Sequence, residues 1–126
     1  LFMVRSNTVT GWLGQSKNIE PTGFDQLNIP LQDQSIFNQV VNSKSHFLGS
    51  IGDTLQNRSL LNMFDSEPPQ TALVIPLLVR DRLVSILYIQ DKIEVLEKHF
   101  TELLNLSRKA EMSFTLLIMK NKILTT

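Results

Sequence analysis

The stretch TALVIPLLVRDRLVSILYIQD, residues Thr71–Asp91, contains two apolar runs separated by three charged residues. Each run is seven or eight residues long and rich in Val, Ile and Leu, which is the length and composition of a buried β-strand. The charged break, Arg80-Asp81-Arg82, has the length of a hairpin turn. These residues predict a buried antiparallel hairpin at the centre of the fold.

A long amphipathic pattern follows the hairpin directly. Asp91 and Glu94 form a capping-box pattern, and no Pro or Gly occurs from Lys92 to Lys122. Such a helix is about 45 Å long, whereas a seven-residue strand spans only about 23 Å. Part of the helix is therefore expected to pack against something other than the sheet. The 3-4-3-4 spacing selects Ile93, Leu96, Phe100, Leu103, Ser107, Ala110, Phe114, Leu117, Asn121 and Leu124.

The first part of the chain predicts shorter elements. Leu1–Arg5 and Thr8–Leu13 indicate a first hairpin that turns at Ser6-Asn7. After a polar loop, Leu27–Gln32 alternates apolar and polar residues, which predicts a short strand. Proline cannot donate to a strand ladder, so Pro30 places this strand at an edge.

Two short helices are predicted before the central hairpin. Ile36–Asn42 is the first, with Asp33 or Ser35 as its cap, and Ser45–Leu48 is a short strand that follows it. Gly49 is expected to end that strand.

The second short helix is predicted from a capping-box pattern, Asp53 with Gln56, and runs to about Phe64. The complete order is strand, strand, strand, helix, strand, helix, strand, strand, helix. This order predicts an α+β domain with a mainly antiparallel sheet. The long C-terminal helix is expected on one face of the sheet, and the short helices and loops on the other.

Composition narrows the function. The chain has 126 residues, enough for one domain, and its twelve basic and twelve acidic residues cancel. A neutral chain has no broad field for collecting phosphate groups, so we expect no nucleic-acid partner. The absence of cysteine excludes thiol nucleophiles and Cys-ligated metals and fits a reducing cytoplasm. No apolar run is long enough for a membrane span, so no membrane partner is expected.

The central hairpin resembles that of GAF domains. In that family an apolar, Pro-containing strand turns through charged or Gly residues and returns as a strand similar to V-x-G-V-L-Y-L-D; here the segments are A-L-V-I-P-L-L-V and L-V-S-I-L-Y-I-Q-D. Leu1–Arg5 with Val9–Trp12 looks like the first GAF hairpin, and the terminal helix looks like the GAF C-terminal helix. The resemblance covers nearly the whole chain. It implies a GAF/PAS-like, profilin-like sheet over residues 1–126 as one domain.

The chain departs from the family pattern in several places. Ser85 stands where a GAF sheet usually has Gly, and the Asn-Lys-Phe-Asp-Glu motif of cyclic-nucleotide-binding GAF domains is missing. No helix precedes Leu1, although GAF domains normally begin with one, so we expect the sequence to be a piece of a longer protein. Without cysteine, covalent bilin attachment and Cys-dependent sulfoxide reduction are excluded.

The predicted ligand contacts are aromatic or polar residues on the elements expected near a pocket. A small-molecule site needs apolar contact area and a few polar groups that orient the ligand. Core packing is the alternative for the aromatic residues, and a cap with a local ion pair is the alternative for Asp53 and Arg58. The candidates are Trp12, Phe24, His46, Phe47, Arg58 and Tyr88. Neither His46 nor His99 has a metal-ligand spacing, and no nucleophile-elbow motif occurs, so no metal, cofactor or catalytic residue is expected.

The terminal helix is too apolar for one buried stripe, because Met112, Leu116 and Met119 lie off the main seam. Burial on several sides within its own domain is one explanation, and a dimer or interdomain helix is the other. We favour the second because of the helix length. The residues predicted for that interface are Phe100, Leu103, Ala110, Phe114 and Leu117.

The resemblance implies a non-enzymatic sensory or regulatory domain of a bacterial signalling or secretion-related protein, cytoplasmic and homodimeric. It would bind a small ligand or a protein partner and relay the signal through helix packing. The alternative is a ligand-free dimerisation or docking module, similar to a profilin or longin domain. A filled pocket would favour that alternative.

Overall fold

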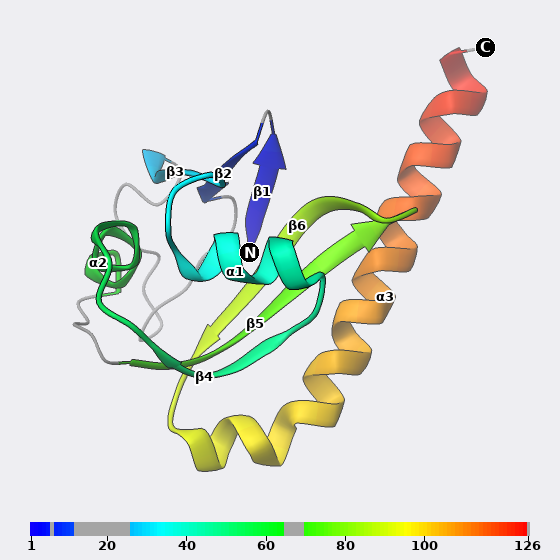
Figure 1. The fold of residues 1–126 in the computed structure, drawn as a ribbon. Coiled ribbons are helices and arrows are strands. Elements are labelled where there is room, and N and C mark those ends of the chain that lie inside the picture. The colour runs from blue at the N-terminus through cyan, green and yellow to red at the C-terminus, as the bar shows by residue number, and fades with distance from the viewer. Residues whose placement is uncertain (6, 12–25, 65–69, 126) are drawn as a thin grey trace.

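A computed structural model of the chain describes residues 1–5, 7–11, 26–64 and 70–125, with the backbone alone for residues 122–125. Its elements follow the predicted order (Figure 1). They are β1 (Phe2–Arg5), β2 (Thr8–Gly11), β3 (Asn28–Pro30), α1 (Ile36–Ser43), β4 (Phe47–Ile51), α2 (Leu55–Asn62), β5 (Gln70–Val79), β6 (Arg82–Gln90) and α3 (Ile93–Thr125).

The strands form one curled antiparallel sheet in the order β3-β2-β1-β6-β5-β4. The β5–β6 hairpin lies in the interior of this order, and the strand that ends at Pro30 lies at an edge, both as predicted. α3 crosses one face of the sheet, and α1 and α2 lie on the other (Figure 1). The α+β class and the separation of the long helix from the short ones are therefore confirmed.

Two hydrophobic clusters lie on opposite faces of the sheet. Ala72 and Val74 of β5 face α1 and α2, whereas Leu73, Ile75 and Leu77 face α3. This division follows from the strand itself, since successive side chains point to opposite faces. Because both faces of the sheet are covered at β5, this strand is apolar at nearly every position, and it therefore appears in the sequence as a continuous apolar run. The α3 side is completed by Leu96 and by the partly buried Leu1, Leu48, Leu87, Ile89, Phe100, Leu103, Leu104, Ala110 and Phe114.

The outer edge of β5 is only half covered by β4, because the pairing begins with Phe47 opposite Val74. Beyond that point Pro76 has no N–H to offer. The next N–H on the same side, that of Leu78, donates to a carboxylate oxygen of Glu111 on α3 at 3.2 Å. Backbone groups two residues apart point to the same side of a strand. Pro76 therefore lies on a stretch of β5 edge that no neighbouring strand of the described residues covers, where its missing N–H breaks no ladder hydrogen bond.

The hairpin turn is one residue shorter than predicted. Val79 pairs with Arg82, so Arg80 and Asp81 alone form the turn and Arg82 belongs to β6. Both turn residues have positive φ, 52° and 64°. A two-residue loop with this geometry is a type I′ turn, which matches the twist of the two strands. The predicted three-residue turn is wrong because strand twist, and not the run of charges, sets the loop length.

Replacing Arg80-Asp81 with Asn-Gly should raise the free energy of unfolding by about 1 kcal/mol, since Asn and Gly tolerate positive φ better than Arg and Asp. Urea unfolding followed by circular dichroism measures the change as a higher midpoint at unchanged slope. The single variants Arg80→Asn and Asp81→Gly should each give part of the gain. A lower midpoint for the double variant would contradict the turn assignment.

Several local boundaries differ from the sequence prediction. Gly49 does not end the short strand, because β4 runs through it and pairs Gly49 with Ala72. The cap of α2 is Thr54, whose hydroxyl accepts the N–H of Asn57, and not Asp53. Gln56 donates to Asp33 at 2.8 Å instead of closing a capping box.

Of the other two predicted caps, one agrees with the structure and one does not. Ser35 caps α1 as predicted, with its hydroxyl accepting the N–H of Asn38 at 3.1 Å. Asp91 accepts the N–H of Lys92 at 2.7 Å, and α3 begins at Ile93, so the predicted pairing of Asp91 with Glu94 is not the contact that the structure has.

Candidate functional site

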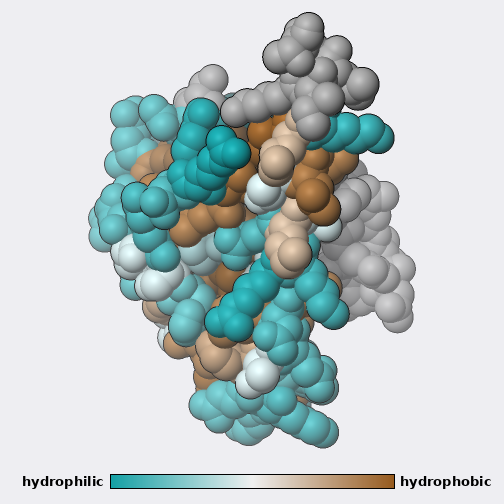
Figure 2. Space-filling model, turned by 90° about the vertical axis from the view of Figure 1, so that its right-hand side faces the viewer, coloured by the Kyte–Doolittle hydropathy of each residue, from teal (hydrophilic) through white to brown (hydrophobic). Residues whose placement is uncertain are grey.

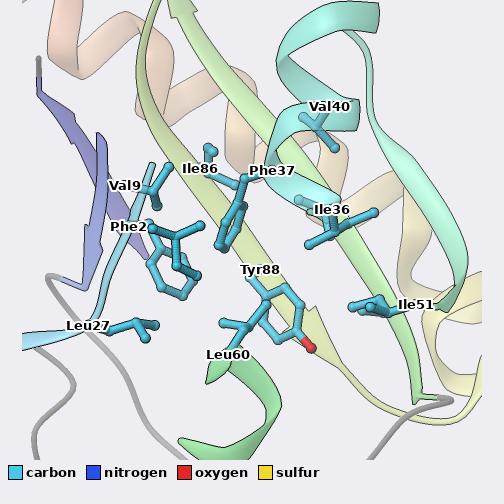
Figure 3. Close-up of a cluster of buried hydrophobic side chains, with 13 residues drawn as sticks. Phe2, Val9, Leu27, Ile36, Phe37, Val40, Ile51, Leu60, Ile86 and Tyr88 are labelled. Carbon is cyan, nitrogen blue, oxygen red and sulfur yellow. The ribbon is translucent and has the colours of Figure 1, made fainter. Parts of the chain in front are cut away.

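The face of the sheet under α1 and α2 is where the resemblance implies a pocket. Thirteen buried side chains meet there, and Figure 3 shows them pointing toward one another between β1, β5, β6 and the two short helices. Phe2 and Phe37 form its centre, with ring centroids 4.9 Å apart. The described part of this face is a packed core. Its members are Phe2, Val9, Leu27, Ile29, Ile36, Phe37, Val40, Ile51, Leu60, Ala72, Val74, Ile86 and Tyr88.

Tyr88 belongs to this core. Its ring stacks on Phe64 with centroids 5.8 Å apart, and its hydroxyl donates to the side-chain oxygen of Gln90 at 2.7 Å. Burial raises the pKa of the Tyr88 hydroxyl above its ordinary value. The Tyr88 ring fills space in the core, and its hydroxyl already has a hydrogen-bond acceptor in Gln90. Tyr88 therefore matches the core-packing alternative.

Ser85 is fully buried, and its hydroxyl donates to the backbone carbonyl of Phe2. The bond joins β6 to β1 where Ser85 pairs with Met3. The departure from the usual glycine therefore has a structural role in this sheet.

Asn57 is a buried polar residue that the sequence patterns did not single out. Its side-chain oxygen accepts the N–H of Ile36 at 2.8 Å, and its amide donates to the carbonyl of Gly52 at 3.1 Å. The first N–H groups of a helix have no partner within it. Asn57 of α2 thus satisfies the start of α1 and fixes the two short helices to each other.

His46 and Phe47 are neighbours in sequence but lie on opposite sides of the sheet. His46 contacts Phe100 of α3, with ring centroids 5.0 Å apart, whereas Phe47 packs against the core under α1 and α2. Adjacent residues entering a strand point in opposite directions. These two candidates therefore cannot line one pocket.

Arg58 lies on the outer side of α2, where it donates to both carboxylate oxygens of Asp53, at 2.7 Å for one of them. Both side chains are more than half exposed. The guanidinium of Arg58 holds the pKa of Asp53 below its usual value. The geometry matches the local ion pair that was the alternative to a ligand contact. The remaining two candidates, Trp12 and Phe24, lie outside the described residues.

The predicted interface residues of α3 divide into two groups. Phe100, Leu103, Ala110 and Phe114 pack against the sheet of their own chain, and Leu117 alone is exposed, at 62%. The first four stabilise the domain itself, so a substitution such as Phe114→Asp would test folding rather than association.

Ser107 is a polar residue within the predicted apolar seam of α3. It is buried, and its hydroxyl donates to the carbonyl of Leu104 at 2.6 Å. Because the helix backbone accepts this hydrogen bond, the polar side chain does not interrupt the seam.

The opposite side of α3 carries exposed apolar residues. We call Leu106, Met112, Leu116 and Leu117 the outer patch; their side chains are 55%, 66%, 65% and 62% exposed. Figure 2 views this side of the molecule and shows apolar residues gathered toward the C-terminal end of the helix, with hydrophilic ones toward its start. Within the described residues, Leu55 is the remaining large apolar side chain with comparable exposure, at 78%.

Other kinds of site find little support in the described residues. They contain no group of three His, Asp or Glu side chains placed to hold a metal ion. None of their helices combines the length and apolar character needed to cross a bilayer.

No family model, no curated protein and no solved structure matches this chain.

Proposed function

We propose that this chain is a GAF-like, non-enzymatic regulatory module that self-associates through α3. The outer patch is the observation that carries the proposal. Four large apolar side chains, each more than half exposed, lie along the part of α3 that faces away from the sheet. Several large apolar side chains exposed on one element are typical of a surface that another molecule covers.

The order of strands and helices and the covering of both sheet faces agree with what the GAF resemblance implies. The filled core under α1 and α2 favours the module that works by association over one with a ligand between those helices and the sheet.

Charge indicates that the partner of the outer patch is a second copy, arranged antiparallel. The first half of α3, residues 93–107, carries Glu94, Glu97 and Glu102 against a single lysine, Lys98. The second half, residues 108–125, carries one glutamate against four basic residues: Arg108, Lys109, Lys120 and Lys122. An antiparallel pair places each acidic half beside a basic half, whereas a parallel pair places like charges together.

The outer patch also selects a register. Leu106 and Leu116 are equidistant in sequence from residue 111, and so are Glu102 and Lys120. If two copies of α3 cross at that residue, Leu106 meets Leu116 of the second copy and Glu102 meets its Lys120. By symmetry each contact occurs twice.

Leu116→Glu should abolish this association and leave the fold intact, because Leu116 is exposed in the single chain. Two leucines per dimer would be lost, each worth about 1.5–3 kcal/mol when buried, so the dissociation constant should rise about a hundredfold or more. Sedimentation velocity over a concentration series measures it. Leu55→Glu, the same change at an exposed leucine of α2, is the matched control and should sediment as the unaltered chain does.

Reversing charges tests the antiparallel register. Glu102→Lys should weaken the dimer, since it sets two lysines opposite each other at both ends, and adding Lys120→Glu should restore it. A chain that sediments as a monomer at all concentrations would overturn the proposed self-association. A dimer whose dissociation constant is the same in the unaltered chain and in both charge variants would overturn the proposed register.

A further inference from the structure

A groove of about 340 Å³ lies beside the tip of the β5–β6 hairpin. Three parts of the chain form it: the end of β1, the hairpin tip, and the C-terminal third of α3, which lies beside that tip in Figure 1. Its volume falls in the range of small-molecule sites. It shares no residue with the outer patch, and two of its lining residues, Val4 and Leu83, also pack against the core under α1 and α2. The residues that line it are Val4, Val79, Arg80, Arg82, Leu83, Val84, Thr115, Ile118 and Met119.

The lining combines apolar walls with positive charge. The two charged residues in it are Arg80 and Arg82, and both are exposed. Within the described part of the chain, neither guanidinium takes part in an ion pair. Thr115, the polar member of the helical wall, already donates its hydroxyl to the carbonyl of Glu111 at 2.9 Å. The groove therefore offers apolar contact and two guanidinium groups that form no ion pair with the described residues.

The backbone at the mouth of the groove is shaped by two irregular features. The β5–β6 register shifts between Leu77 and Leu78, so Val84 has no partner in β5 and enters the groove lining as an extra residue. Arg80 occupies a turn position, at φ 52°, that Asn or Gly fills at lower cost. The turn thus keeps a guanidinium at the groove mouth at the expense of backbone stability.

We propose that this groove binds an aliphatic acid, with its carboxylate against Arg80 and Arg82 and its hydrocarbon chain along Val84, Ile118 and Met119. A guanidinium matches a carboxylate in shape and charge, and the apolar wall takes the chain. The inference goes beyond self-association, which needs no ligand. Because Ile118 and Met119 belong to α3, occupation of the groove would restrain the same helix that carries the outer patch.

Octanoate is a suitable probe, and the methionines report where it binds. The chain has four methionines, and ¹³C labels at their methyl groups give separate NMR signals, among them those of Met119 in the groove, Met112 on the outer side of α3 and Met63 beside the other core. Octanoate should shift the Met119 signal in a saturable way and leave those of Met63 and Met112 unchanged.

Charge specificity is tested with matched ligands and variants. The double variant Arg80→Gln/Arg82→Gln should bind octanoate about tenfold or more weakly, and Arg108→Gln, which removes one positive charge elsewhere on α3, should bind it as the unaltered chain does. Octanol and octylammonium should bind more weakly than octanoate.

An unmoved Met119 signal would overturn the proposal. So would equal binding of octanol or octylammonium, or a double variant that binds octanoate unchanged. Leu116→Glu should still bind octanoate, so a failed dimer and a failed ligand site give different results.

Discussion

Phe37→Ala should lower the free energy of unfolding by about 4 kcal/mol, because it removes a large side chain from a core that cannot close around the space. Phe37 is fully buried, and its ring packs on Phe2 at 4.9 Å. It also joins α1 to the sheet, so the loss includes the contact between two layers. A loss of this size is a large part of the stability of an ordinary domain.

Urea unfolding followed by both tyrosine fluorescence and circular dichroism measures this change. Leu55→Ala is the control, since Leu55 is 78% exposed and its truncation should leave the midpoint within about 0.5 kcal/mol. A variant Phe37→Ala that unfolds at the original midpoint would contradict the filled core, and would restore the case for an open pocket under α1 and α2.

Asn57→Leu should lower the free energy of unfolding by about 2 kcal/mol, although it replaces a polar residue in a buried position with an apolar one of similar size. The substitution leaves the N–H of Ile36 and the carbonyl of Gly52 without the partners that Asn57 supplies. A buried group that loses its hydrogen bond costs about 1–3 kcal/mol. The N–H of Ile36 is such a group, whereas the carbonyl of the exposed Gly52 can bond to water instead, so most of the cost comes from Ile36.

The matched control is Asn42→Leu, the same exchange at an exposed position of α1, where the side chain makes one long contact with Asn38 at 3.4 Å. It should change stability by about 0.5 kcal/mol or less. Hydrogen exchange of the Ile36 amide gives a second reading, since Asn57→Leu should speed it more than it speeds the amides of β5. Equal stability of the two variants would mean that Asn57 does not join α1 to α2.

The elements that the sequence predicted well are those specified by local patterns. The run from Ala72 to Val79 is apolar throughout because both faces of β5 are covered, and the seam from Leu96 to Phe114 repeats at the period of a helix and packs on the sheet. The long helix was also predicted to be longer than the sheet, and Figure 1 shows the C-terminal turns of α3 extending past the tip of the β5–β6 hairpin.

What the sequence predicted less well depends on single atoms or on distant residues. Asp53 and Thr54 are both good capping residues, and only the structure shows that Thr54 caps α2 while Asp53 pairs with Arg58. His46 and Phe47 were both predicted to contact a ligand because both lie on an element expected near a pocket, and in the structure their side chains lie on opposite faces of the sheet.

The groove was missed for a related reason. Val4, Arg82 and Met119 come from three elements far apart in the chain, and no spacing pattern joins them. The one signal present was the Arg-Asp-Arg segment, which was interpreted only as a hairpin turn.

The outer edge of β5 has a consequence for the behaviour of the chain at high concentration. An uncovered strand edge recruits strands from other molecules and begins aggregation. Here Pro76 offers no N–H, and the carboxylate of Glu111 already holds the N–H of Leu78. A second chain that approached this edge would find no free donor at either residue. α3, through which we propose that the chain self-associates, thus also supplies the carboxylate that protects this edge of the sheet from aggregation.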